Sequence, residues 1–223
     1  EKTITSMANY INLGNQRFAE SLNDEYIDKT GLIAEINATL FKRNRFTCVS
    51  RCRRFGKSMA AEMLCAYYDK SCESRELFRG LEIENNPDFE THLNKYPVIY
   101  VELTNFITDY GHDNKIVDYL QADVIKSVVK AYPDVELSNP HRLMDVLIDI
   151  AAATGERFIF IIDEWDAICR EFERGEKAME EYVMLLRRMF KSSDALGVFA
   201  GVYMTGILPI KKYKTESALN NFW

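Results

Sequence analysis

The most restrictive feature of the sequence is the run Phe158-Ile159-Phe160-Ile161-Ile162, in which every residue is apolar. A strand with one face in water alternates apolar and polar residues, whereas a strand covered on both faces is apolar throughout. This run therefore predicts a strand inside a sheet that carries helices on both sides. Other β-prone stretches occur at 46–50, 97–103 and 198–204.

Segments with helical periodicity separate these strands. Apolar residues recur at helical spacing within 57–68, 116–129 and 176–190. Asn139-Pro140 is typical of a helix start and Gly155 of a helix end, which predicts another helix between them. The alternation predicts an α/β fold, with a mostly parallel sheet flanked by helices and a helical N-terminal extension of about 40 residues.

Composition narrows the functional classes. The 223 residues are 47% hydrophobic and 28% charged, as in ordinary globular domains. A net charge of −6 argues against a protein that coats nucleic acid with its whole surface. The five cysteines form no Cys-x-x-Cys pair, which argues against a zinc site or a disulfide framework and favours the cytoplasm. No apolar run approaches the ~20 residues of a membrane span, and no signal peptide is evident at the N-terminus.

The strand at 46–50 leads directly into Arg51-Cys52-Arg53-Arg54-Phe55-Gly56-Lys57-Ser58 and then into a helix. A phosphate-binding loop follows the pattern G-x-x-x-x-G-K-[ST] in this same strand–loop–helix order, and here Arg51 replaces its first glycine. Gly56 lets the backbone approach phosphate oxygens, and the helix N-terminus behind it offers unpaired N–H groups. Lys57 is suited to reach the β- and γ-phosphates, and the Ser58 hydroxyl to ligate Mg²⁺.

Basic residues gather around this loop. No acidic residue occurs between Glu35 and Glu62, whereas seven basic ones do: Lys42, Arg43, Arg45, Arg51, Arg53, Arg54 and Lys57. Polyphosphate binding explains this local excess of positive charge in an acidic protein. A solvated turn between strand and helix is the simpler alternative. Direct nucleic-acid binding by residues 43–57 is a third interpretation.

The apolar run at 158–162 ends in two adjacent carboxylates, Asp163 and Glu164. A P-loop NTPase needs an acidic residue at the end of a neighbouring strand to hold Mg²⁺, and we assign this role to Asp163. A second carboxylate can orient and polarise the attacking water, which we assign to Glu164. The alternative is a buried strand whose polar end simply emerges into solvent. The acids together with Gly56-Lys57-Ser58 favour a nucleotide site.

Three further features leave alternatives open. Thr205 ends the strand at 198–204 and either senses the γ-phosphate or only starts a Thr-Gly turn. Arg187-Arg188 on a predicted helix is more typical of a solvated face than of an arginine finger. The lysines at the end of the chain are typical of a surface segment, with nucleotide or nucleic-acid contact as the alternative. They are Lys211, Lys212 and Lys214.

Four motifs appear in an order that resembles a known family. They are Tyr26-Ile27-Asp28-Lys29-Thr30, the segment 51–58, Ile162-Asp163-Glu164-Trp165-Asp166 and Thr205-Gly206-Ile207-Leu208-Pro209-Ile210. Together they resemble the AAA-ATPase-like family of bacterial P-loop proteins, over nearly the whole chain. That family normally lacks the first glycine of the loop, so Arg51 is compatible with a P-loop. Cys52 replaces its usual proline and Trp165 its usual tyrosine.

The resemblance implies a P-loop NTPase-type domain that binds ATP with Mg²⁺ and hydrolyses the γ-phosphate. Lys57 and Glu164 are then the expected catalytic residues, and Ser58 and Asp163 the expected metal ligands. The expected nucleotide-binding residues are Arg51, Cys52, Arg53, Arg54, Phe55, Gly56, Lys57, Ser58 and Met59. We divide the single domain into a helical extension at 1–44, a nucleotide-binding core at 45–210 and the start of a truncated C-terminal region at 211–223.

Members of this family often continue into a PD-(D/E)xK nuclease-like domain. The resemblance therefore implies an ATPase that drives or gates such a domain or another partner. A nucleotide-binding switch with negligible hydrolysis, which regulates a nucleic-acid-acting domain, is the alternative. Pro87-Asp88 and Asp113-Asn114-Lys115 formally match a nuclease signature within this chain. The second segment reads as a turn rather than a strand, so we interpret the match as accidental.

Overall fold

The computed structural model describes residues 8–23, 25–52, 56–207, 209 and 219–223. Within these residues four parallel strands form one sheet in the order β1-β4-β3-β2. The strands are β1 (Phe46–Ser50), β2 (Val98–Glu102), β3 (Phe158–Asp163) and β4 (Phe199–Gly206). The predicted parallel sheet is confirmed. The strand order corrects the expectation that the acidic strand neighbours the strand before the predicted phosphate loop, because β4 lies between β3 and β1.

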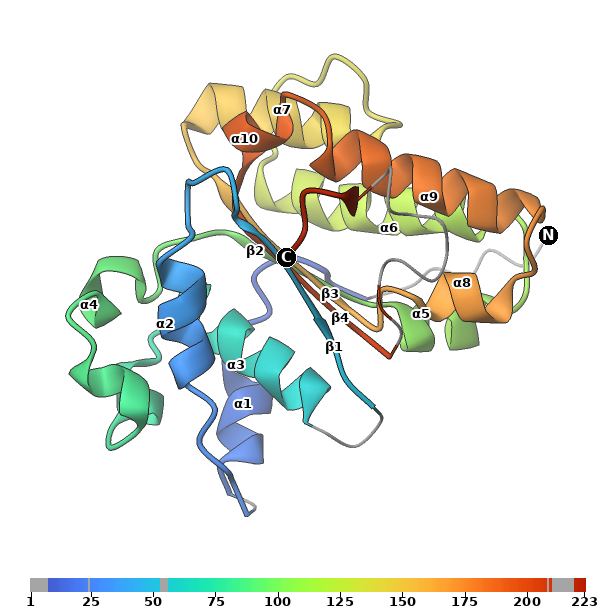
Figure 1. Ribbon diagram of the computed structural model, residues 1–223. Helices are drawn as coiled ribbons and strands as arrows, with labels where there is room; N and C mark the ends of the chain where they lie inside the picture. The colour runs from blue at the N-terminus through green and yellow to red at the C-terminus, as the bar shows by residue number, and fades with distance from the viewer. Residues whose placement is uncertain (1–7, 24, 53–55, 208, 210–218) are drawn as a thin grey trace.

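Helices cover both faces of the sheet (Figure 1). One face carries α1 (Gln16–Ser21), α2 (Gly31–Asn37), α3 (Lys57–Tyr68), α4 (Phe89–His92) and the 3-10 turns η1 (Arg75–Phe78) and η2 (Glu82–Asn85). The other carries α6 (Ile116–Ala131), α7 (Leu143–Thr154), α9 (Lys177–Phe190) and α10 (Ala195–Val198). Two short helices, α5 (Leu103–Tyr110) and α8 (Ala167–Glu171), follow β2 and β3 at their carboxyl ends.

The apolar run in β3 is buried on both sides, as its composition requires. Phe158, Phe160 and Ile162 belong to the core that includes α6, α7 and α9. Ile159 and Ile161 belong to the second core, beneath α1, α2 and α3. Each of the five side chains is at most 5% exposed. Burial of an aliphatic or aromatic side chain of this size contributes about 1.5–3 kcal/mol, so β3 stabilises the packing of both helical layers, as do its neighbours β2 and β4, which also contribute side chains to both cores.

Both edges of the sheet are covered by segments distant in sequence. At the β2 edge, Ile11 forms an antiparallel bridge with Ile99, and the Asn12 N–H donates to the Val98 carbonyl at 2.8 Å. At the β1 edge, the Trp223 N–H donates to the Phe46 carbonyl at 3.1 Å. Covered edges do not offer unpaired backbone groups to another chain. The N-terminal segment therefore contributes extended backbone as well as the helices α1 and α2.

The predicted start of α7 is wrong by several residues, whereas its predicted end is right. The helix begins at Leu143, with Arg142 rather than Asn139 as its N-cap. The Asn139 side chain instead accepts the His141 N–H at 3.3 Å and donates to Asp145 at 3.0 Å. Asparagine forms this kind of local turn as readily as it caps a helix. Gly155 ends the helix in the left-handed conformation, with φ of 75°.

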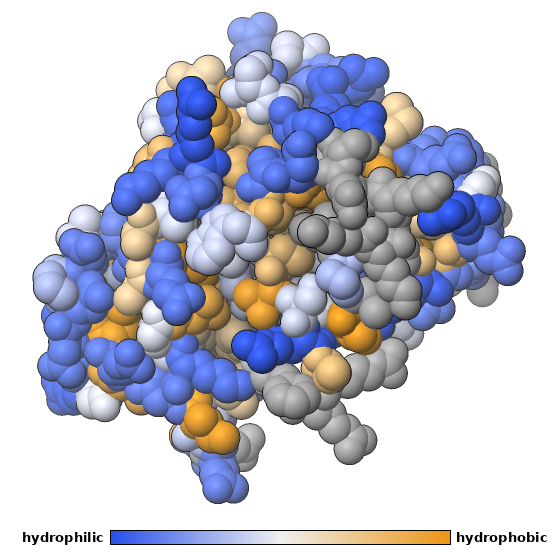
Figure 2. Space-filling view, in the orientation of Figure 1, coloured by the Kyte–Doolittle hydropathy of each residue, from blue (hydrophilic) through white to orange (hydrophobic). Residues whose placement is uncertain are grey.

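The outer surface is mostly hydrophilic in the view of Figure 2, and apolar residues show chiefly in the middle of this face. Large apolar side chains with at least two fifths of their surface exposed are Ile27, Phe41, Met184, Leu196 and Trp223. Among the residues described, no helix combines the length and the apolar character that crossing a bilayer requires.

Replacement of Ile161 by alanine should test the importance of β3 burial. Ile161 is 0% exposed, so loss of its side chain should reduce the free energy of unfolding by about 2–5 kcal/mol. Ile27 is 72% exposed, and the control Ile27→Ala should change it by no more than about 0.5 kcal/mol. Urea unfolding of both variants measures the difference, and equal losses would contradict the two-sided core.

Candidate functional site

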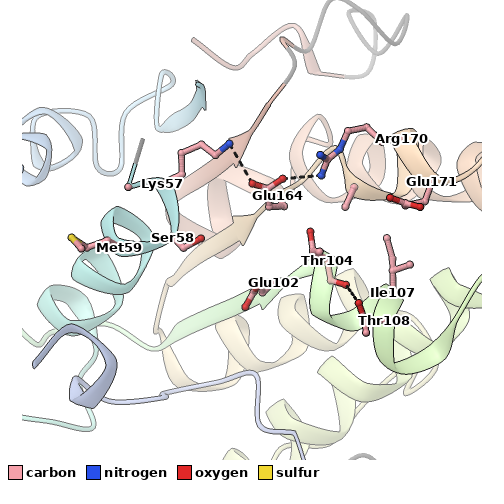
Figure 3. A pocket seen from close by; sticks show the side chains of 12 residues that line it. Lys57, Ser58, Met59, Glu102, Thr104, Ile107, Thr108, Glu164, Arg170 and Glu171 are labelled. Atoms are coloured by element: carbon pink, nitrogen blue, oxygen red, sulfur yellow. Dashed lines mark hydrogen bonds and ion pairs between the residues drawn. The ribbon is translucent and has the colours of Figure 1, made fainter. Parts of the chain in front are cut away.

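A cleft of about 600 Å³ opens at the carboxyl ends of β2 and β3, beside the N-terminus of α3 (Figure 3). Its walls come from three segments of the chain. The residues that line it are Gly56, Lys57, Ser58 and Met59 from the start of α3, Glu102, Thr104, Ile107 and Thr108 from β2 and α5, and Glu164, Ala167, Arg170 and Glu171 from the end of β3 and α8. Open parallel sheets bind ligands at this edge.

Gly56 precedes α3 in the left-handed conformation, with φ of 69° and ψ of 30°. A Cβ atom at this position would lie 2.5 Å from the Nζ atom of Lys29. The positive φ therefore favours glycine here, and a side chain at this position would also require the flexible end of Lys29 to move. The 12-residue helix that follows presents its N-terminus, with its partial positive charge, at the cleft.

The Tyr26–Thr30 motif explains why Lys29 lies beside this glycine. One carboxylate oxygen of Asp28 accepts the N–H of Thr30 at 2.8 Å and its hydroxyl at 2.7 Å. The other oxygen accepts the Glu82 N–H at 2.8 Å. Asp28 thus fixes the loop on both sides of Lys29. The fold brings this motif and the Gly-Lys-Ser motif together.

Lys57 and Glu164 meet across the cleft, although 106 sequence positions separate them. The Lys57 Nζ atom lies 3.3 Å from Oε1 of Glu164 and donates to the Arg51 carbonyl at 2.9 Å. Oε2 of Glu164 accepts from Nη2 of Arg170 at 2.7 Å. Two cations therefore flank this carboxylate, one on each oxygen (Figure 3).

The backbone of Glu164 adopts the left-handed region, with φ of 55°. This conformation costs a residue other than glycine about 1–2 kcal/mol. Thr205 holds the turn, because its carbonyl accepts the Trp165 N–H at 2.8 Å and its hydroxyl accepts the Glu164 N–H at 3.3 Å. Backbone strain of this kind is common where a side chain must be aimed at a ligand, and here it directs the carboxylate into the cleft.

Asp163 lies beneath the cleft rather than on its wall. It is 0% exposed, and it accepts hydrogen bonds from the Thr205 hydroxyl and, at 3.5 Å, from the Tyr100 hydroxyl. Thr205 is also 0% exposed. The Thr205 hydroxyl thus joins Asp163 to the Glu164 backbone, a structural role beyond the two alternatives that the sequence left open. A sensor role for Thr205 stays a prediction.

A family model described as predicted AAA-ATPase matches residues 12–215. The chain belongs to this AAA-ATPase family. No curated protein and no solved structure gives a significant match. The family match spans every element that builds the cleft, from the loop that carries Lys29 to the end of β4.

Three charged residues of this AAA-ATPase cleft escaped the sequence analysis, namely Glu102, Arg170 and Glu171. Glu102 ends β2 directly opposite Asp163 in the parallel register, and it accepts from the Asn105 amide at 2.8 Å. The sequence did contain an indication of Glu102, because this residue follows an apolar strand just as Asp163 does. Arg170 gave a weaker signal, namely its position four residues after Asp166 on a short helix.

The seven basic residues do not form one cluster. Arg45 is 5% exposed and donates to backbone carbonyls around the start of β1, among them Phe199 at 2.7 Å and Leu196 at 3.1 Å. Arg51 and Lys57 lie beyond its other end. A strand advances about 3.3 Å per residue, so β1 holds the two groups apart. The expected cluster of seven basic residues around the loop is therefore wrong for Arg45 and for its exposed neighbours Lys42 and Arg43.

The remaining predicted residues fall into three groups. Ser58 and Met59 line the cleft, whereas Arg51 and Cys52 are exposed beside it. Arg187 and Arg188 line a separate surface hollow on α9, where Arg188 pairs with Asp145. Six further residues lie outside the described part of the chain: Arg53, Arg54, Phe55, Lys211, Lys212 and Lys214.

The oxygen atoms at the cleft are suitable ligands for a hard divalent cation such as Mg²⁺. Among the described residues, no three His, Cys, Asp or Glu side chains form a metal-binding cluster. Mg²⁺ is commonly bound by one or two protein oxygens together with phosphates and water. The cleft offers such oxygens on Ser58, Glu102 and Glu164, with the expected ligand Asp163 behind them.

Thr205→Val should show how strongly this hydroxyl braces the two acids. Valine keeps the shape of threonine but leaves a buried carboxylate oxygen without that donor, which should lower the free energy of unfolding by about 1–3 kcal/mol. Thr205→Ser keeps the hydroxyl and is the matched control. Urea unfolding in the absence of nucleotide compares the two variants. Equal stability would show that the Thr205 hydroxyl does not stabilise the two acids.

Glu102 should make stability depend on pH. Burial, followed by the negative charge of Asp163, raises the pKa of Glu102 above its ordinary value of 4.5. The folded state thus binds the Glu102 proton more tightly than the unfolded state does. Protonated Glu102 therefore stabilises the fold fully below pH 4.5, and this contribution is lost as the pH rises through the pKa of the folded state. Glu102→Gln should therefore be more stable than wild type at about pH 7 but not at about pH 4. Thermal unfolding at both pH values checks this, and a less stable variant at neutral pH would contradict it.

Proposed function

We propose that this chain binds ATP together with Mg²⁺, hydrolyses the γ-phosphate, and so drives or gates a partner or an attached domain. The observation that carries this proposal is the meeting of Lys57 and Glu164, 3.3 Å apart, in a cleft at the N-terminus of α3. A cation, helix amides and a carboxylate are the groups that phosphoryl transfer to water requires.

Phosphate binding changes the partners of Lys57. The N-terminus of α3 and the Lys57 ammonium group attract phosphate oxygens, which carry more negative charge than the Glu164 carboxylate. When Lys57 moves to a phosphate, Oε1 of Glu164 loses that cation. This oxygen can then accept a proton from a water placed against the γ-phosphate. Charge neutralisation on the β- and γ-phosphates is the chemistry that Mg²⁺ supplies when bound, and Ser58 with Glu102 or Asp163 would hold it.

One observation favours the second candidate, a switch with negligible hydrolysis. Both oxygens of Glu164 are engaged by cations, Lys57 on one and Arg170 on the other. A carboxylate held in this way is a poor base for water. If nucleotide binding leaves these pairs intact, the chain holds nucleotide and changes shape without turning it over.

Lys57→Met and Glu164→Gln separate these candidates. Lys57→Met should weaken ATP binding by about tenfold or more, because one charged contact contributes about 1.5–3 kcal/mol. Glu164→Gln should bind ATP at least as tightly as wild type does, because the carboxylate that competes with phosphate for Lys57 and Arg170 is gone, and should release phosphate about 10²–10⁴ times more slowly. Calorimetric titration with ATP, and with GTP for comparison, measures binding, and a phosphate-release assay measures turnover.

Lys95→Met is the control for these variants. Lys95 is exposed just before β2, at the opposite end of the sheet from the cleft, so its loss should change neither measurement. Tight ATP binding by wild type without phosphate release would favour the switch. Binding and turnover that survive both cleft substitutions would remove the proposed site.

A further inference from the structure

We propose that Arg170 contacts the γ-phosphate from within the same chain and thereby distinguishes ATP from ADP. This inference rests on the proposed nucleotide site and assigns a role to a side chain that the P-loop and the twin acids leave unexplained. Arg170 is part of α8, directly behind β3, and its side chain is 17% exposed on the cleft wall.

The contacts of Arg170 define its reach. Its Nη2 atom lies 2.7 Å from Oε2 of Glu164, and its Nε atom lies 3.6 Å from Oδ2 of Asp166. Asp166 is 0% exposed, and the same Oδ2 accepts the Ile207 N–H at 3.2 Å. A buried carboxylate is thus fixed behind the guanidinium stem. It forms an ion pair with the Nε side of the guanidinium group, while Nη2 contacts Glu164 at the cleft.

Glu164 occupies the place between two cations that a terminal phosphate would take. Lys57 lies on one of its oxygens and Arg170 on the other (Figure 3). A γ-phosphate offers three oxygens and more negative charge, so it competes with Glu164 for both cations. Lys57 is next to the helix N-terminus and meets any nucleotide phosphate first. Arg170 lies on the opposite side of Glu164 from Lys57. Only a phosphate that extends past Lys57, such as the γ-phosphate, can replace Glu164 as the partner of Arg170.

The consequence is a selective release of Glu164. ADP engages Lys57 and leaves the Arg170–Glu164 pair in place. ATP engages both cations, so that Arg170 moves to the γ-phosphate and Glu164 can accept a proton from water. Arginine suits this task because its planar fork can remain on Asp166 while it exchanges one anion for another. Lysine has one nitrogen in place of the planar fork, so it cannot contact the two anions from separate nitrogen atoms as arginine does.

Arg170→Met and Arg170→Lys test this assignment on the full chain. Affinities for the non-hydrolysable analogue AMP-PNP and for ADP are measured with Mg²⁺ by calorimetry. Arg170→Met should lose about tenfold or more in AMP-PNP affinity, since a charged hydrogen bond is lost, but less than about threefold in ADP affinity. Its kcat should fall about 10²-fold or more, as when a donor to transition-state charge is removed. Arg170→Lys should recover only part of either loss.

Arg79→Met is the matched control, because Arg79 forms an exposed pair with Glu76 away from the cleft. Equal losses in AMP-PNP and ADP affinity, or an unchanged kcat, would overturn the role of Arg170. If Lys57→Met then still weakens ATP binding by about tenfold or more, the nucleotide site stands and only the Arg170 assignment fails. A wild-type chain that binds no nucleotide would overturn both.

A measurement on the wild-type chain covers the case in which Arg170 variants do not fold. Hydrogen–deuterium exchange over residues 164–171 is compared for the nucleotide-free, ADP-bound and AMP-PNP-bound states. AMP-PNP should change exchange in this segment, because Arg170 leaves Glu164, whereas ADP should leave it as in the nucleotide-free chain. The same exchange in the AMP-PNP and ADP complexes would contradict the proposal.

Discussion

Burial of β3 on both faces determines where the polar chemistry of this chain can lie. Its side chains alternate between two cores, so a carboxylate can reach a ligand only beyond the end of the strand. Because the strands are parallel, the ends of β2 and β3 and the start of α3 meet at one edge. The helical layers thus do more than stabilise the sheet. They exclude every other place for Glu102, Glu164 and Lys57 to come together.

Two carboxylates next to the cleft residue Glu164 are wholly buried, Asp163 and Asp166. Burying an ionised carboxylate costs several kcal/mol unless donors surround it. Both have donors on β4 or just after it: Thr205 for Asp163, and the Ile207 backbone for Asp166. The end of β4 therefore fixes the acidic turn at the end of β3. This explains the close packing of Gly206, where a Cβ would lie 2.6 Å from the Trp165 ring nitrogen.

The local pattern of apolar residues was enough to predict the strands and α3. A strand buried on both faces appears in the sequence as a continuous apolar run, and a helix appears as apolar residues at helical spacing. Local pattern also identified Lys57 and Glu164, which carry their chemistry within short motifs. It could not give the insertion of β4 between β1 and β3, since strand order is a long-range property. For the same reason it assigned Arg45 to the phosphate loop, although the guanidinium caps carbonyls at the opposite end of β1. Arg170 became visible only through its contact with Glu164.

The pairing of Glu164 with two cations links binding to chemistry. In the proposed nucleotide site, an entering phosphate would displace a carboxylate already paired with Lys57 and Arg170, so part of its binding energy would be spent on that exchange. Energy used in this way weakens binding of the ground state but exposes the base only when the correct phosphate is present. The strained backbone of Glu164, held by Thr205, keeps the carboxylate in place after its partners leave. In the proposed site, Glu164 could therefore act as a base only after phosphate has taken over its two cationic partners.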